Sequence, residues 1–348
     1  MHRRHIHIDL AKILAAQFIV LHHFTAYGPL AQSWGTSTAA LTDWLFEYGR
    51  MAVQVFLVIG GYLAAMGLAP QGNLKPSTPW RPIAQRYLRL TPSYAVALLL
   101  AIAASLFASQ WMDDDFIPEQ PDIGQFAAHL ALLNGFVDFE PLTVGTWYVA
   151  MDFQLFALLT LMLWVGRRWA RWMVAALAIA SLFYFNLNES MSDWAPYFFG
   201  AYGMGAIAWW AGRSKYAVRY LTLLALIGAV ALLWDFRLRI ALAGATALLL
   251  GVGLWHRTHR VAPSAQPLSA KCMPDWLTSV IAALARSSYA LFLVHFSVLI
   301  LANTWFAQLD TSRSITLWCM LVGAWAVSQV LALLFERWVE RPLSQLKI

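Results

Sequence analysis

The first apolar segment of the chain carries ionisable side chains in a pattern that suits chemistry across a membrane. Residues 6–28 are mostly apolar, yet Asp9, Lys12 and His23 lie among them. At about 100° per residue, the eleven steps from Lys12 to His23 return to within about 20° on a helix, so the two side chains would share one face roughly 16 Å apart along the axis. Asp9, three residues before Lys12, can pair with it. A neutral imidazole can take a proton or act as a nucleophile near pH 7. The alternative interpretation is a snorkelling lysine and a histidine that only makes packing hydrogen bonds.

Two arginines stand at the start of the apolar segment at about 83–109. Arg86 and Arg89 are three residues apart, so they share a helix face. Two guanidinium groups on one face suit a phosphate-rich ligand. The alternative is that both only anchor the segment at a positively charged membrane boundary.

Later apolar segments also contain ionisable residues, each of which costs roughly 2.5–3.5 kcal/mol to insert and so needs a reason. Asp152, in the segment 143–165, needs a cation, hydrogen-bond donors or a proton. Pairing with a basic residue of a neighbouring helix and a catalytic role both account for it. Tyr289 and His295 are six residues apart and would face different ways, so they need not share a role. Glu340 belongs to a charged cluster that could simply end the last segment.

The elements that must hold these residues are predicted by composition. Of 348 residues, 60% are hydrophobic and only 12% are charged, against roughly 25% charged in soluble domains. A membrane span needs about 20 mostly apolar residues. The sequence therefore predicts an all-α polytopic membrane protein of about ten spans, at about 6–28, 47–68, 83–109, 143–165, 170–187, 194–212, 217–234, 238–255, 277–306 and 314–336.

The distribution of charge predicts how these spans are oriented. If the N-terminus is cytoplasmic and each segment crosses, 20 of the 24 Lys and Arg residues lie inside and 4 lie outside. This bias favours an even number of spans with both termini cytoplasmic. The net charge of +6 is then a topology signal, and we expect no nucleic-acid partner. The acids lean the other way, because the predicted outer segment 110–142 has seven Asp and Glu residues and no Lys or Arg.

We expect one membrane domain over residues 1–348, whose first segment stays in place as a span because it lacks a small-residue cleavage site. Within the segment 110–142, the apolar stretch 126–136 is too short to span. The inner segment 256–276 contains three prolines and should be irregular. Cys272 and Cys319 indicate neither a disulfide framework nor a zinc site, and no metal-ligand spacing occurs.

Taken in order, these motifs resemble those of the acyltransferase family 3 membrane proteins, which are bacterial O-acyltransferases of surface polysaccharides and related glycans. The family's first-span motif of Asp, Arg and His is matched by Asp9, Lys12 and His23, with lysine where arginine is usual. Its second-span motif is matched by residues 55–62, with Gly60 where serine is usual. The later motifs are matched by Arg86, Arg89 and Pro92, by Trp147, Asp152 and Gln154 where glutamate is more usual, by Ser288, Tyr289, Leu293 and His295, and by Glu340 and Pro342.

The resemblance implies a membrane-embedded enzyme that moves an acyl group, commonly acetyl, from cytoplasmic acyl-CoA to a hydroxyl of an extracytoplasmic glycan or glycolipid. It implies a multi-pass protein of the bacterial inner membrane that needs no metal. We assign catalysis to His23 and Asp152, with His23 as general base or acyl carrier, and donor binding to Lys12, Arg86 and Arg89. A further set would bind substrate or support the structure: Asp9, Trp147, Tyr289, His295 and Glu340.

Two other classes of function fit the same composition. A transporter or flippase for a small solute or lipid-linked glycan would also have about ten spans and a few buried polar groups. A structural or partner-binding subunit would not depend on His23. The sequence leaves open the acceptor, the length of the acyl group and the oligomeric state.

Overall fold

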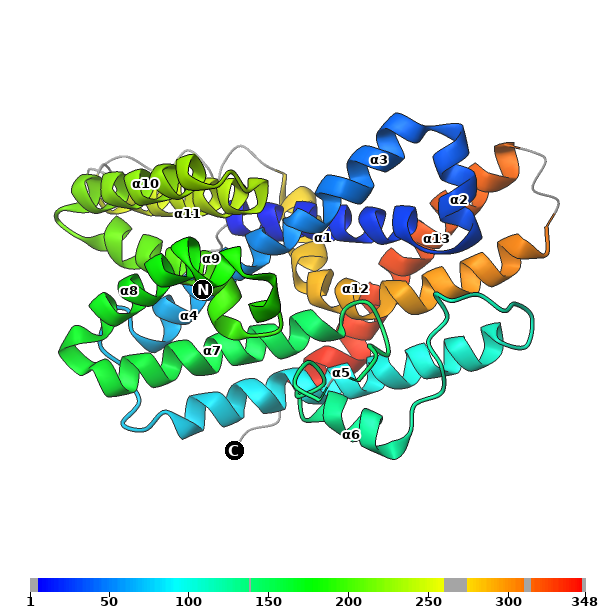
Figure 1. Cartoon of the computed structure of the whole chain (residues 1–348), viewed down its shortest axis with the longest axis horizontal. Coiled ribbons are helices and arrows are strands. Elements are labelled where there is room, and N and C mark those ends of the chain that lie inside the picture. Colours follow the sequence, from blue (N-terminus) through cyan, green and yellow to red (C-terminus); the bar gives the residue numbers. More distant parts are fainter. Residues whose placement is uncertain (1–5, 138, 260–273, 310–313, 346–348) are drawn as a thin grey trace. The chain divides into compact units, whose positions relative to one another are not determined.

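The computed structural model describes residues 6–137, 139–259, 274–309 and 314–345, and every regular element in these ranges is helical (Figure 1). The α-helices are α1 Ile6–Ala26, α2 Gly28–Ser37, α3 Ala39–Tyr48, α4 Val53–Leu68, α5 Trp80–Ala108, α6 Ile123–Leu130, α7 Thr146–Gly166, α8 Ala170–Phe183, α9 Ala195–Arg213, α10 Ala217–Trp234, α11 Leu238–His259, α12 Asp275–Ala307, α13 Ser314–Phe335 and α14 Arg341–Leu343. Short 3-10 turns are η1 Gly49–Ala52, η2 Arg167–Trp169, η3 Phe185–Leu187 and η4 Glu189–Met191, and a π-helical turn is η5 Glu336–Glu340.

Eight helical stretches of the described chain are long and apolar enough to cross a membrane, which confirms the all-α polytopic class. All ten predicted blocks fall on helices. The described chain has eight such stretches and the sequence predicted ten, partly because two predicted blocks fall in the single stretch Thr146–Leu187 of 42 residues. At about 1.5 Å per residue this run would be about 63 Å long, roughly twice the hydrocarbon core. Arg167 has φ of 44°, so the chain turns there and α7 and α8 are separate helices.

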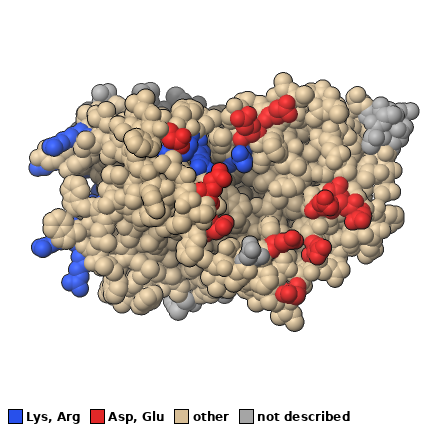
Figure 2. Space-filling view, in the orientation of Figure 1, with Lys and Arg blue, Asp and Glu red and all other residues tan. Residues whose placement is uncertain are grey.

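The second reason for the lower number is α9, which is not among the eight stretches because its glycine, tyrosine and tryptophan residues lower its mean hydropathy. Large apolar side chains elsewhere face outward, as lipid-exposed helices require. Among the most exposed are Leu233, Trp234, Phe236 and Leu249. Lys, Arg, Asp and Glu cover only a small part of the surface seen in Figure 2.

The described chain forms two compact units, each assembled from segments far apart in sequence. Unit 1 consists of the described residues of 1–8, 53–86 and 151–279, and unit 2 of those of 9–52, 87–150 and 280–348. The expectation of one domain over the whole chain stays a prediction.

Helix α9 is the centre of unit 1, where it packs against α4, α8, α10 and α11. Small residues let its backbone approach that of α4 directly. A Cβ atom at Gly61 would lie 1.9 Å from the carbonyl oxygen of Tyr202, and one at Gly205 would lie 2.0 Å from that of Val58. The two helices are therefore in backbone contact, and glycine is required at both positions.

Polar contacts hold α1 beside α12 and α13 in unit 2. The chain turns between α1 and α2 at Gly28, whose φ of +77° favours glycine. The amide of Asn303 on α12 lies against this turn and accepts a hydrogen bond from the Leu30 N–H at 2.8 Å. Gln17 on α1 accepts one from the Trp325 indole of α13 at 2.8 Å. These contacts fix the helix that carries Asp9, Lys12 and His23.

The segment between α5 and α7 contains the short helix α6, which Asp122 caps by accepting a hydrogen bond from the Gln125 N–H. His129 lies 2.8 Å through Nδ1 from the Gln125 carbonyl, and its Nε2 accepts from the Leu142 N–H at 3.3 Å. Burial lowers the pKa of His129 below its ordinary value. The apolar stretch 126–136 is only partly helical, and the eight residues of α6 cannot span a bilayer. In the segment 256–276, which the sequence predicts to lie inside, residues 260–273, with Cys272 among them, lie outside the described residues, whereas Cys319 is an exposed free thiol.

Candidate active site

Two histidines from distant parts of the sequence meet inside unit 2. His23 on α1 and His295 on α12 lie with Nδ1 of the first 2.7 Å from Nε2 of the second. Their ring planes differ by only 11°, and the ring centroids are 5.0 Å apart. His23 is 8% exposed and His295 is fully buried. The sequence placed both residues among the site candidates, but it assigned His295 no part in the chemistry.

The hydrogen bonds of this imidazole pair fix where its protons lie. His295 Nδ1 is 2.9 Å from the carbonyl oxygen of Leu291, which can only accept, so Nδ1 carries a hydrogen. A neutral His295 then has its lone pair on Nε2, and His23 must donate from Nδ1. The Nε2 atom of a neutral His23 therefore keeps its lone pair. That atom can accept a proton or attack an electrophilic carbon.

Aromatic side chains surround the imidazole pair. The rings of His22, Tyr27 and Phe292 lie 5.2, 5.9 and 6.3 Å from the nearer imidazole, and Tyr148 of α7 lies 5.0 Å from Phe292. Sequence reasoning missed Tyr27, Phe292 and Tyr148. Helical spacing could have found the first two, since Tyr27 follows His23 by four residues and Phe292 precedes His295 by three.

A charged cluster lies at the other end of α1. This helix is continuous from Ile6 to Ala26, so Lys12 lies on the same face as His23 and roughly 16 Å away along the axis. Glu340, in the π-helical turn η5, is close enough to Arg89 and Lys12 to interact electrostatically with both. Its Oε2 is buried and has no hydrogen-bond partner among the described residues. Unit 2 thus brings together three of the predicted site residues, two cationic and one acidic. Turns of the π type often mark functional positions.

Asp152 and Arg86 form an ion pair within unit 1. The Arg86 guanidinium also lies 5.3 Å from the ring centre of Phe156, and the buried Tyr202 is near enough to interact with the Asp152 carboxylate. At Gly60 an added Cβ would lie 3.7 Å from Asp152 Oδ1. The carboxylate thus has the basic partner that one of the two interpretations required. Sequence reasoning missed Tyr202, which no motif marked.

The remaining predicted residues lie in less enclosed places. Trp147 is 40% exposed, with its ring 6.0 Å from that of Tyr148. Asp9 and Tyr289 are partly exposed in α1 and α12. Their assignment as substrate-binding or structural residues stays a prediction.

A comparison with known families accounts for both the helices and the motifs. The model of the acyltransferase domain of the acyltransferase 3 family matches residues 5–337, nearly the whole chain. No curated protein and no solved structure matches the chain. The match includes both members of the imidazole pair, the Arg86–Asp152 ion pair and both cations near Glu340. The chain therefore belongs to the acyltransferase 3 family and is a multi-pass membrane acyltransferase.

Proposed function

We propose that this protein transfers an acyl group, acetyl in the first instance, from cytoplasmic acyl-CoA to a hydroxyl of an extracytoplasmic glycan or glycolipid. The proposal includes cytoplasmic termini and a place in the bacterial inner membrane, which the excess of basic residues on one side supports. The observation that carries it is the imidazole pair, since the hydrogen bonds of His295 leave the His23 Nε2 lone pair available.

In this mechanism His23 acts on the acceptor. Its Nε2 takes the proton of the acceptor hydroxyl as the oxygen attacks the thioester carbonyl carbon. The bond from that carbon to sulfur breaks, coenzyme A leaves as the thiolate, and the imidazolium returns the proton to sulfur. If His23 instead carries the acyl group, Nε2 attacks the thioester carbonyl carbon, the carbon–sulfur bond breaks and coenzyme A leaves as the thiolate. The acceptor oxygen then attacks the carbon of the acyl-imidazole, the carbon–nitrogen bond breaks, and the hydroxyl proton goes to the thiolate.

The charged cluster is assigned to the donor. Lys12 and Arg89 attract the phosphates of coenzyme A. The roughly 16 Å from Lys12 to His23 along α1 is comparable to the length of a pantetheine arm, so the thioester reaches the imidazole while the phosphates stay at the cytoplasmic end. In unit 1 we assign Asp152 to hold the guanidinium of Arg86 in place, and the assignment of Arg86 to donor binding stays a prediction.

The test uses the purified protein in lipid nanodiscs with radiolabelled acetyl-CoA and the surface polysaccharide of a strain that lacks this gene. We expect label in the polysaccharide with one free thiol released per acyl group, which a transporter would not produce. His23→Ala should abolish transfer while donor binding is retained. Lys12→Gln with Arg89→Gln should weaken donor binding. The control is His259→Ala, which changes an exposed histidine of α11. Full activity of His23→Ala would refute the assignment.

A further inference from the structure

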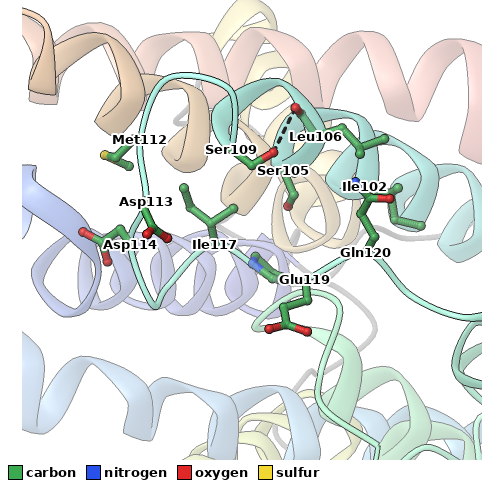
Figure 3. A pocket seen from close by; sticks show the side chains of 11 residues that line it. Ile102, Ser105, Leu106, Ser109, Met112, Asp113, Asp114, Ile117, Glu119 and Gln120 are labelled. Carbon is green, nitrogen blue, oxygen red and sulfur yellow. Dashed lines mark hydrogen bonds between the residues drawn. The ribbon is translucent and has the colours of Figure 1, made fainter.

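Unit 2 contains a hollow outside the imidazole pair and the charged cluster. It has a volume of about 390 Å³ and lies between the last turns of α5 and the segment that follows them (Figure 3). This volume is within the usual range of small-ligand pockets. Its polar lining comes from Ser105, Ser109, Asp113, Asp114, Glu119 and Gln120. No predicted site residue contributes to it.

The hollow is strongly acidic. Three of its lining residues are carboxylates, and the surrounding segment 110–142 contains no Lys or Arg. Asp114 accepts a hydrogen bond from the Phe116 N–H, which holds that part of the segment in place. Asp113 and Glu119 make no ion pair with any other residue that the structure describes. Their oxygen atoms can therefore accept hydrogen bonds from a ligand.

Ser105 gives an independent sign of a ligand. It is only 6% exposed, and its hydroxyl has no hydrogen-bond partner among the described residues. A serine in a helix commonly bonds to a carbonyl of the preceding turn, and Ser109, just beyond the end of α5, bonds in this way to the carbonyl of Leu106 at 3.1 Å. In Figure 3 the Ser105 hydroxyl instead points away from its helix toward the loop that encloses the hollow. A buried polar atom without a partner calls for an explanation, and a bound hydroxyl group would supply one.

The lining indicates the class of ligand. In the described ranges no group of three or more His, Cys, Asp or Glu side chains is arranged to hold a metal ion. Carboxylate, hydroxyl and amide groups suit a ligand with many O–H donors. Ile102, Leu106 and Ile117 add an apolar wall that can pack against the C–H faces of a sugar ring.

The position of the hollow relates it to the imidazole pair. Gln308, just beyond α12, donates a hydrogen bond at 3.2 Å to the carbonyl of Trp111, which directly precedes the lining residue Met112. Gln308 follows His295 by thirteen residues, which is roughly 20 Å along a helix. A ligand in the hollow therefore lies well away from the reacting atoms.

We propose that the hollow binds sugar units of the acceptor glycan that are distant from the hydroxyl to be acylated. This inference rests on the proposed function, because it takes a glycan as acceptor and the segment 110–142 as extracytoplasmic. Contacts with a remote part of the substrate lower KM for long acceptors and take no part in the chemistry. The hollow is then a determinant of acceptor length.

The test compares two acceptors, the whole polysaccharide from the gene-deficient strain and its mild-acid fragments of disaccharide length. The variant Asp113→Asn/Asp114→Asn/Glu119→Gln removes the three charges, and Ser105→Ala removes the hydroxyl. We expect the triple variant to raise KM for the polysaccharide about tenfold or more, as expected for loss of hydrogen bonds to charged groups, with little change for the fragments. Asp115→Asn is the matched control, since this exposed neighbour does not line the hollow.

Binding of the polysaccharide without donor is measured in parallel, so the hollow is tested even if the wild type transfers no acyl group. Weaker polysaccharide binding by the triple variant supports the proposal. An equal loss for both acceptors, or no loss for either, overturns it. If spermidine binds the wild type but not the triple variant while polysaccharide binding is unchanged, the hollow is a site for cations and the proposal is wrong.

Discussion

His295 lets the tautomer argument be tested directly. His295→Leu removes the acceptor that the Nδ1 hydrogen of His23 requires and leaves a buried donor without a partner. Such a loss costs roughly 1–3 kcal/mol, and at about 1.36 kcal/mol per tenfold the transfer rate should fall roughly 5- to 150-fold. Donor binding should not change, because Lys12 and Arg89 lie at the other end of α1.

Two further variants separate this role from simple packing. The amide of glutamine can occupy the place of the histidine Nε2 atom, whereas that of asparagine occupies the place of Nδ1. Only Nε2 of His295 contacts His23. We therefore expect His295→Gln to retain most activity and His295→Asn to resemble His295→Leu. The assay is label transfer in nanodiscs at saturating donor, with thermal melting as the fold control. Equal activity of the Gln and Asn variants, at equal melting temperatures, would refute the reasoning.

Two more results are expected. Gly61→Ala places a Cβ atom 1.9 Å from the Tyr202 carbonyl oxygen and should lower the free energy of unfolding by about 1–3 kcal/mol or more. The control Gly228→Ala, whose Cβ would have no atom within 4 Å, should change that free energy by less than about 1 kcal/mol. Thermal melting in detergent compares the two variants, and equal melting temperatures would contradict the packing of α4 on α9. Because burial lowers the folded-state pKa of His129, local stability of the α6 region should be greatest above pH 6.5 and fall as the pH drops below that value. The protection factor of the Leu142 amide against hydrogen exchange, taken relative to the intrinsic rate at each pH, should then fall on acidification, and His129→Gln should remove this dependence; a protection factor that does not change with pH would contradict it.

The sequence was a good guide to the helices because a membrane allows few alternatives. A backbone in lipid must satisfy its hydrogen bonds internally, so long apolar blocks become helices. All ten blocks fall on helices in the described chain. The weakest case was α9, since a helix buried by its neighbours can be rich in glycine and give no strong hydropathy signal.

The site was harder to predict, because its contacts join distant segments. His23 and His295 are 272 residues apart, and no periodicity relates them. A basic partner for Asp152 was one of two interpretations, but nothing in the sequence selected Arg86. Motif order identified most of the polar residues, whereas the aromatic wall and the hollow at the end of α5 depend on packing.

The reciprocal glycine contact between α4 and α9 has a consequence for motion. At these two glycines the backbones meet with no side chain between them, so a shift of either helix there drives a carbonyl oxygen against a backbone atom, while the rings of Tyr62 and Trp209 pack beside the contact with their centroids 5.3 Å apart. We therefore expect any rearrangement of unit 1 during a reaction cycle to move α4 and α9 together.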